Sequence, residues 1–153
     1  MNRIELNNRK KCVQILKSMG WDAMPVENKA CDGTPDLNAS RTVASNVTTF
    51  LSECVEIWIE LKIVEEWPKR KATPIKIPHF SPAQKAWLKL RIRQNQNCYI
   101  IVQIEEEHLL YLVNLEVIEH FGSDWNKEQM YENAMYVSTK LEVVLNSLQK
   151  GLK

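Results

Sequence analysis

The segment VEIWIELKIV, residues 55–64, carries the clearest structural signal in the chain. Aliphatic residues occupy every second position from 57 to 63, and the positions between them carry Glu56, Trp58, Glu60 and Lys62. Side chains of a β-strand point alternately to its two faces, so this pattern predicts a strand with one aliphatic face. Glu60 and Lys62 are then expected to project side by side from the opposite face.

The segment GTPDLNAS, residues 33–40, predicts a tight turn that leads into a neighbouring strand. Gly and Pro mark turns, and Asp36 directly follows Pro35. Residues 41–53 are rich in Ser, Thr and Asn and predict a loop or hairpin tip whose role the sequence leaves open. Asp36 and Glu60 are therefore expected to converge at the ends of two adjacent strands.

Helices are predicted on both sides of this hairpin. Residues 3–19 have apolar residues at helical spacing and end before a glycine, and Glu5 lies on their inward stripe. After the proline-rich segment 67–80, Ser81 and Pro82 begin a helix that runs to about residue 94. In that helix Trp87 is expected to face the core. The residues expected to face outward are Gln84, Lys85 and Arg91.

The remaining sequence completes a mixed sheet. It predicts a β-hairpin from strands 98–104 and 108–113, short helices at 115–121 and 125–132, a short strand at 134–138, and a C-terminal helix to about residue 150. The order α-β-β-β-α-β-β-α indicates a central sheet flanked by helices, in the α/β or α+β class. A chain of 153 residues fits one domain, residues 1–153. The apolar stripe of the last helix is open to two interpretations, core or dimer face.

Composition excludes several protein classes. The chain is 44% apolar and 25% charged, as in ordinary globular domains, and it has no apolar run of bilayer length. Its first residues lack the apolar core of a signal peptide, which favours a cytoplasmic protein. The four cysteines are scattered singly, which argues against a zinc knuckle or a disulfide framework and favours burial of each. They are Cys12, Cys31, Cys54 and Cys98.

Basic residues are concentrated in one segment, although the net charge is only +1. Residues 69–93 contain no Asp or Glu, and their basic side chains are those of Lys69, Arg70, Lys71, Lys76, Lys85, Lys89, Arg91 and Arg93. A local concentration of positive charge is sufficient to bind the phosphates of a nucleic acid. The alternative interpretation is a solvated helix face.

The two carboxylates and the lysine suggest a metal-dependent reaction. Mg²⁺ and Mn²⁺ prefer oxygen ligands, so Asp36 and Glu60 are candidate ligands, and the backbone carbonyl of Leu61 is available as a third. Lys62 is then suited to orient or deprotonate a water molecule, or to neutralise charge that builds on phosphorus. The competing interpretation is an ion pair between Glu60 and Lys62 on a half-exposed strand, which contributes little energy.

Pro35-Asp36 followed by Glu60-Leu61-Lys62 resembles the signature of the PD-(D/E)XK nucleases, which share the restriction-endonuclease-like fold. The resemblance covers residues 3 to 113. It is closest to the small Holliday junction resolvases and the virus-type replication–repair nucleases, which often carry a Q-x-x-W/F-L motif in the next helix, as Gln84 to Leu88 do here. Such nucleases often have a first-helix glutamate near the metal, a position that Glu5 matches. The long interval between Asp36 and Glu60 departs from the pattern.

This resemblance implies a Mg²⁺- or Mn²⁺-dependent DNA endonuclease. Asp36 and Glu60 would bind the metal, Lys62 would assist the attacking water, and Gln84 would position the lysine or the phosphate. The backbone of the DNA would be held by Lys69, Arg70, Lys71, Lys76 and Lys85.

Branched DNA is the expected substrate, because a chain of this length has no room for a separate target-recognition domain. Symmetrical cutting of two strands implies a homodimer, and analogy suggests a phage or other mobile element as the source. Two alternatives stay open. One is a restriction or repair nuclease of the same fold, and the other is a non-catalytic nucleic-acid-binding module.

Overall fold

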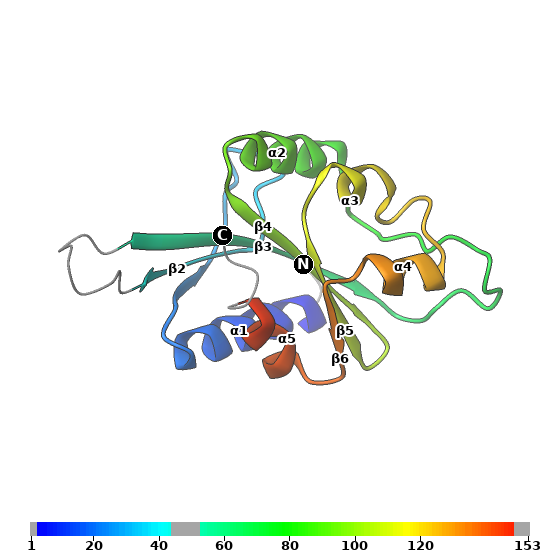
Figure 1. Cartoon of the computed structure of the whole chain (residues 1–153), viewed down its shortest axis with the longest axis horizontal. Coiled ribbons are helices and arrows are strands. Elements are labelled where there is room, and N and C mark those ends of the chain that lie inside the picture. The colour runs from blue at the N-terminus through cyan, green and yellow to red at the C-terminus, as the bar shows by residue number, and fades with distance from the viewer. Residues whose placement is uncertain (1–2, 44–52, 149–153) are drawn as a thin grey trace.

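A computed structural model describes residues 3–43 and 53–148, which form a six-stranded sheet between two layers of helices (Figure 1). The sheet has the order β1-β2-β3-β4-β5-β6. Neighbouring strands run antiparallel except β3 and β4, which are parallel. The elements are α1 (Arg3–Ser18), β1 (Asp22–Pro25), β2 (Leu37–Val43), β3 (Glu53–Val64), α2 (Pro82–Arg93), β4 (Asn97–Ile104), β5 (Glu107–Leu112), α3 (Leu115–His120), α4 (Lys127–Asn133), β6 (Tyr136–Ser138) and α5 (Leu141–Ser147).

The predicted mixed sheet flanked by helices is confirmed, and each face of the sheet has its own apolar core. α1 and α5 cover one face, where Leu16 and Leu145 pack against Ile57 and Ile59 of β3. α2, α3 and α4 cover the other face, where Trp87 packs with residues of β4 and β5. Because both faces of the second half of β3 are covered, Glu60 and Lys62 lie between two helical layers, whereas Glu53 and Glu56 near the start of the strand are exposed.

Helix α2 begins as its sequence predicts. The Ser81 side chain accepts a hydrogen bond from the Gln84 backbone N–H, and the Gln84 side chain accepts one from the Ser81 N–H, which is a capping box. Pro82 occupies the first turn, where the missing N–H costs nothing. This reciprocal cap fixes the position of Gln84 at the start of the helix.

Some expectations were wrong at the ends of elements. β2 reaches Val43 and β3 begins at Glu53, so residues 41–43 and 53, which were predicted as loop, belong to strands; residues 44–52 lie outside the described chain. Helix α5 ends at Ser147, and the predicted end near residue 150 also lies outside the described residues.

The prediction that every cysteine is buried is half right. Cys12 and Cys98 are buried in the two cores, whereas Cys31 and Cys54 are exposed, because one lies in a turn and the other near the start of β3. All four are free thiols. Within the residues that the structure describes, no helix has both the length and the apolar character needed to cross a bilayer.

Gly33 brings the turn before β2 into direct contact with α2. Its φ is +88°, and a Cβ added there would lie 2.4 Å from the backbone carbonyl of Ala83 and 2.7 Å from the Gln84 nitrogen. The contact is therefore backbone against backbone, and no side chain fits between the two segments. The separation between the turn that carries Asp36 and the helix that carries Gln84 is set by this glycine.

Gly33→Ala should destabilise the protein more than Gly20→Ala does. Both glycines have a positive φ, 88° and 86°, but a Cβ at Gly20 meets nothing within 4 Å. Gly20→Ala should cost only the left-handed backbone penalty, about 1 kcal/mol. Gly33→Ala adds a collision with the α2 backbone and should cost roughly 2 kcal/mol more. Urea denaturation of both variants measures the difference, and equal losses of stability would contradict the close approach of the two backbones.

Candidate active site

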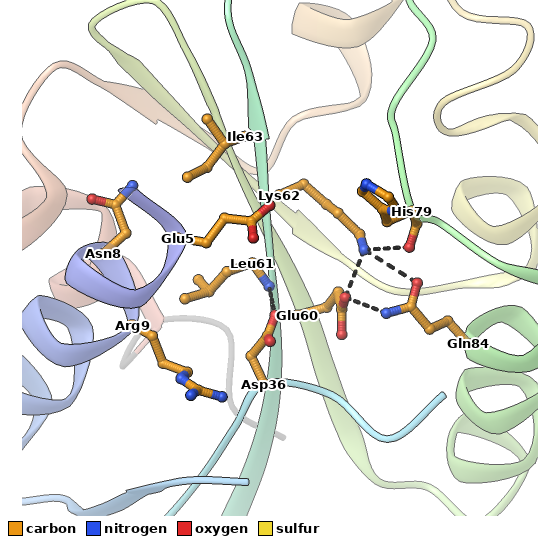
Figure 2. Close-up of a pocket in the computed structure, with 10 residues that line it drawn as sticks. All are labelled: Glu5, Asn8, Arg9, Asp36, Glu60, Leu61, Lys62, Ile63, His79 and Gln84. Carbon is orange, nitrogen blue, oxygen red and sulfur yellow. Dashed lines mark hydrogen bonds and ion pairs between the residues drawn. The ribbon is translucent and has the colours of Figure 1, made fainter. Parts of the chain in front are cut away.

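The candidate site lies where β3 extends beyond β2. The register between β2 and β3 ends at the pair Leu37–Ile59, whereas β4 accompanies β3 as far as Val64. Asp36, the residue just before β2, accepts a hydrogen bond from the Leu61 backbone N–H through Oδ2 at 2.8 Å (Figure 2). A carboxylate thus takes the place of the missing strand partner, which satisfies a backbone donor that would otherwise be unpaired.

Glu60 and Lys62 form a buried ion pair on the α2 side of β3. Lys62 Nζ lies 2.7 Å from Glu60 Oε1, and the side chains of Glu60 and Lys62 are only 3% and 6% exposed, respectively. Lys62 Nζ also donates to the His79 carbonyl oxygen at 2.7 Å and to Gln84 Oε1 at 3.1 Å. Gln84 Nε2 in turn donates to Glu60 Oε1 at 2.5 Å. The expectation that Gln84 faces outward was wrong, because its capping position turns the amide toward β3.

Helix α1 closes the other side of the site. A pocket of about 350 Å³ lies between α1, the open edge of β3 and α2, and it is lined by Asp36, Glu60 and Lys62 together with Glu5, Asn8, Arg9, Leu61, Ile63, His79 and Gln84. Figure 2 shows α1 presenting Glu5, Asn8 and Arg9 on one side of β3, and Gln84 on the other side. All the side chains that were predicted to act in catalysis or metal binding line this one pocket.

Burial dominates the electrostatics of the two carboxylates. It raises the pKa of Asp36 above its ordinary value of 3.8, against the lowering effects of the Leu61 N–H and of Lys62. Burial and the neighbouring charge of Asp36 raise the pKa of Glu60 from 4.5 to about 7, although Lys62 and Gln84 oppose this shift. The charge of Asp36 makes Glu60 harder to ionise, and the charge of Glu5 makes Asp36 harder to ionise, so the site attracts positive charge.

Arg9 and the strained backbone of His79 are features that the sequence did not reveal. Arg9 is a buried charged residue, 5% exposed, which pairs with Glu27 at 3.1 Å and lowers the pKa of Asp36 through its charge. His79 has a φ of +60°, an uncommon value for a residue other than glycine, and directs its carbonyl to Lys62. A helical period of four from Glu5 could have indicated Arg9, since both then face the same side.

Four of the five basic residues predicted to bind DNA lie on the connection from β3 to α2, which extends past the end of the sheet (Figure 1). Lys69, Arg70, Lys71 and Lys76 are exposed there. Lys85 is half-buried in α2, with Nζ 5.2 Å from the centre of the Phe80 ring. None of these side chains lines the active-site pocket, so their contact with a substrate would be made outside it.

The donor set fits a hard divalent cation held by two carboxylates. Asp36 and Glu60 provide oxygen ligands, and the Leu61 carbonyl points to the same open edge as its N–H, because the two groups of a strand residue share one edge. Within residues 3–43 and 53–148, no three His, Cys, Asp or Glu side chains form a group that could hold a metal. Glu5 lines the pocket without completing such a group.

Comparison with known proteins supports the fold. No protein-family model and no curated protein sequence matches this chain. Among solved structures, it is similar to Hjc, a Holliday junction resolvase from the archaeal hyperthermophile Archaeoglobus fulgidus. The TM-score is 0.51, the sequence identity is 14%, and the match covers 92% of this chain and 98% of Hjc. The restriction-endonuclease-like fold that the sequence resemblance implied is thereby confirmed.

Stability without divalent cations should fall as the pH rises from about 4.5 to about 7 and level off above. The pKa of Glu60 is higher in the folded protein than its ordinary value, so the folded state binds more protons than the unfolded state in this window. The full difference corresponds to roughly 3 kcal/mol. Chemical denaturation in EDTA across this range measures the slope.

Glu60→Gln should flatten that slope, because it removes the titrating group. Glu56→Gln is the matched control, since Glu56 lies on the exposed part of the same strand. The slope should persist in this control. A slope of equal size in the wild type and in Glu60→Gln would show that Glu60 is not its source.

Proposed function

We propose that this protein is a divalent-metal-dependent DNA endonuclease that acts on branched DNA. The observation that carries the proposal is the meeting of Asp36, Glu60 and Lys62 in one pocket at the open edge of β3. The fold shared with an archaeal Holliday junction resolvase supports the same class of activity. Hydrolysis of a phosphodiester needs an activated water and neutralisation of charge on phosphorus, and this group of residues suits both needs.

Asp36 and Glu60, with the Leu61 carbonyl, would hold Mg²⁺ or Mn²⁺. When bound, such an ion lowers the pKa of a coordinated water and polarises the phosphate. The raised pKa values of both carboxyl groups mean that the pocket by itself disfavours their full ionisation. A cation would relieve this penalty, so cation binding should release protons near neutral pH.

All three N–H donors of the Lys62 ammonium group already have acceptors in the protein. An ammonium group has three N–H donors, and those of Lys62 have three acceptors, namely Glu60, Gln84 and His79. Contact with water or phosphate therefore requires Lys62 to release one of them. Gln84, which is bonded to both Glu60 and Lys62, keeps the amine beside the pocket while that exchange occurs.

DNA would reach the pocket along the exposed basic connection between β3 and α2. Its lysines and arginine are suited to contact phosphates without reading bases. Paired cleavage of a branched substrate requires two sites, so the active form would be a homodimer.

Cleavage of a four-way DNA junction should require a divalent cation and should depend on Asp36, Glu60 and Lys62. Asp36→Asn, Glu60→Gln and Lys62→Ala should each lower the single-turnover rate by at least about a hundredfold, because each removes a group that stabilises charge. Junction binding in EDTA should survive in Lys62→Ala. The assay compares junction, flap, linear duplex and single strand with Mg²⁺, Mn²⁺ or EDTA.

The outcomes separate the candidate functions. Equal cutting of junction and linear duplex would favour a restriction or repair nuclease of this fold. If the wild type binds DNA but cuts none of the four substrates with either metal, the catalytic proposal fails and a non-catalytic binding module is favoured.

Replacing Lys69, Arg70 and Lys71 together by Ala should make DNA binding less sensitive to salt. Each phosphate that the protein no longer neutralises reduces the slope of log K against log salt by about 0.9. The control replaces Lys17 and Lys140, which are exposed on other parts of the chain, by Ala. Titrations at several salt concentrations give the slopes, and an unchanged slope in the triple variant would exclude this loop from the interface.

A further inference from the structure

A second hollow adjoins the active-site pocket, and we name it the side pocket. Its volume is about 410 Å³, and it shares Glu5, Ile63 and His79 with the active-site pocket. From there it extends over Ile4 of α1 and Pro78 of the β3–α2 connection. The two hollows therefore lie next to each other, and a ligand whose reacting group enters the first has its adjacent group near the second.

Part of the wall of the side pocket is apolar. Ile4 is 54% exposed, Ile63 is half-buried, and Pro78 is exposed, so these apolar surfaces face a space open to solvent. Exposed apolar surface that lies among polar side chains in one hollow is typical of sites that bind a partly apolar ligand. The imidazole-bearing residue His79 stands between the two hollows and adds a flat ring.

The charged residues of the side pocket are acidic. Glu5 and Glu65 line it, and no lysine or arginine does so among the residues described there. Carboxylates repel phosphate, so the DNA backbone is not the occupant that this lining favours. A carboxylate such as that of Glu65 can accept hydrogen bonds from amino groups, as those of adenine, cytosine and guanine provide.

The geometry points to a binding site for one unpaired nucleobase, immediately next to the phosphate that is cut. This inference rests on the proposed nuclease function and deepens it. A base is flat and uncharged and carries N–H groups, which matches the apolar part of the wall, the neighbouring His79 and an acidic acceptor. A base can enter only after it leaves the stack of the duplex.

Selection for branched DNA follows from that requirement. Extruding a base from an intact duplex costs a few kcal/mol, whereas a base at a branch point is already partly unstacked and costs less. The side pocket would thus favour branched substrates without any contact that reads sequence. Its contribution is separate from that of the basic connection, which binds any DNA backbone.

The test uses the wild-type protein and four-way junctions that carry one abasic nucleotide, moved stepwise through the positions around the cut site. Affinity is measured in EDTA, and single-turnover cleavage with Mg²⁺. At one position next to the cut phosphate, removal of the base should weaken binding by about five- to tenfold. The slope of binding against salt should not change, because no phosphate is removed.

Ile4→Ala should weaken binding of the intact junction by about fivefold, because it removes apolar surface from the wall that the base covers. On the abasic junction whose binding is weakened, Ile4→Ala should have little further effect, because the contact between Ile4 and the base is already absent there. Leu115→Ala is the matched control, because Leu115 is 55% exposed on α3, away from both hollows. It should bind all junctions as the wild type does.

The outcomes are distinct from those of the nuclease proposal. If the protein binds and cuts junctions but the abasic scan is flat, the base site is wrong and the nuclease stands. If Ile4→Ala weakens the intact and abasic junctions equally, the side pocket does not hold that base. If no DNA is bound or cut, both proposals fail.

Discussion

Residues 60–64 of β3 have a strand neighbour on only one side, and the candidate site is built on that open edge. β2 ends its pairing at Ile59, so the Leu61 N–H needs another acceptor, which Asp36 supplies. This one hydrogen bond fixes the first carboxylate against the strand that carries the second. The pocket, the raised pKa values of both acids and the engagement of Lys62 all depend on the mismatch in length between the two strands.

Much of this arrangement could be predicted from local sequence. Strict alternation over 57–63 identified β3 and put Glu60 and Lys62 on one side, because the two-residue period of a strand leaves few alternatives. Ser81 and Pro82 marked the start of α2 because capping is a local interaction. Features decided within a few residues of each other were therefore accessible, including the mixed sheet and its flanking helices.

Features that depend on tertiary packing were not accessible in the same way. The sequence allowed an ion pair on a half-exposed strand. Helices on both sides of β3 instead bury Glu60 and Lys62, so these charges depend on hydrogen bonds from and to their protein partners. Gln84 was expected outside, although its capping role and the close approach at Gly33 turn it toward the sheet. The helical period could have placed Arg9 on the same side of α1 as Glu5, but its burial depends on which strand end α1 covers.

The residues that line the active-site pocket all lie between positions 5 and 84, whereas β4, β5, β6 and the last three helices complete the cores beneath it. The residues that line the pocket thus come from the first part of the chain, whereas both parts of the chain supply core residues. The described chain beyond residue 84 lines no part of the pocket and contributes core packing, which many sequences of similar shape and apolarity can provide. Substitutions there that keep size and apolarity should therefore leave the pocket unchanged, and the 14% identity with a protein of the same fold shows how widely the sequence of this fold can vary.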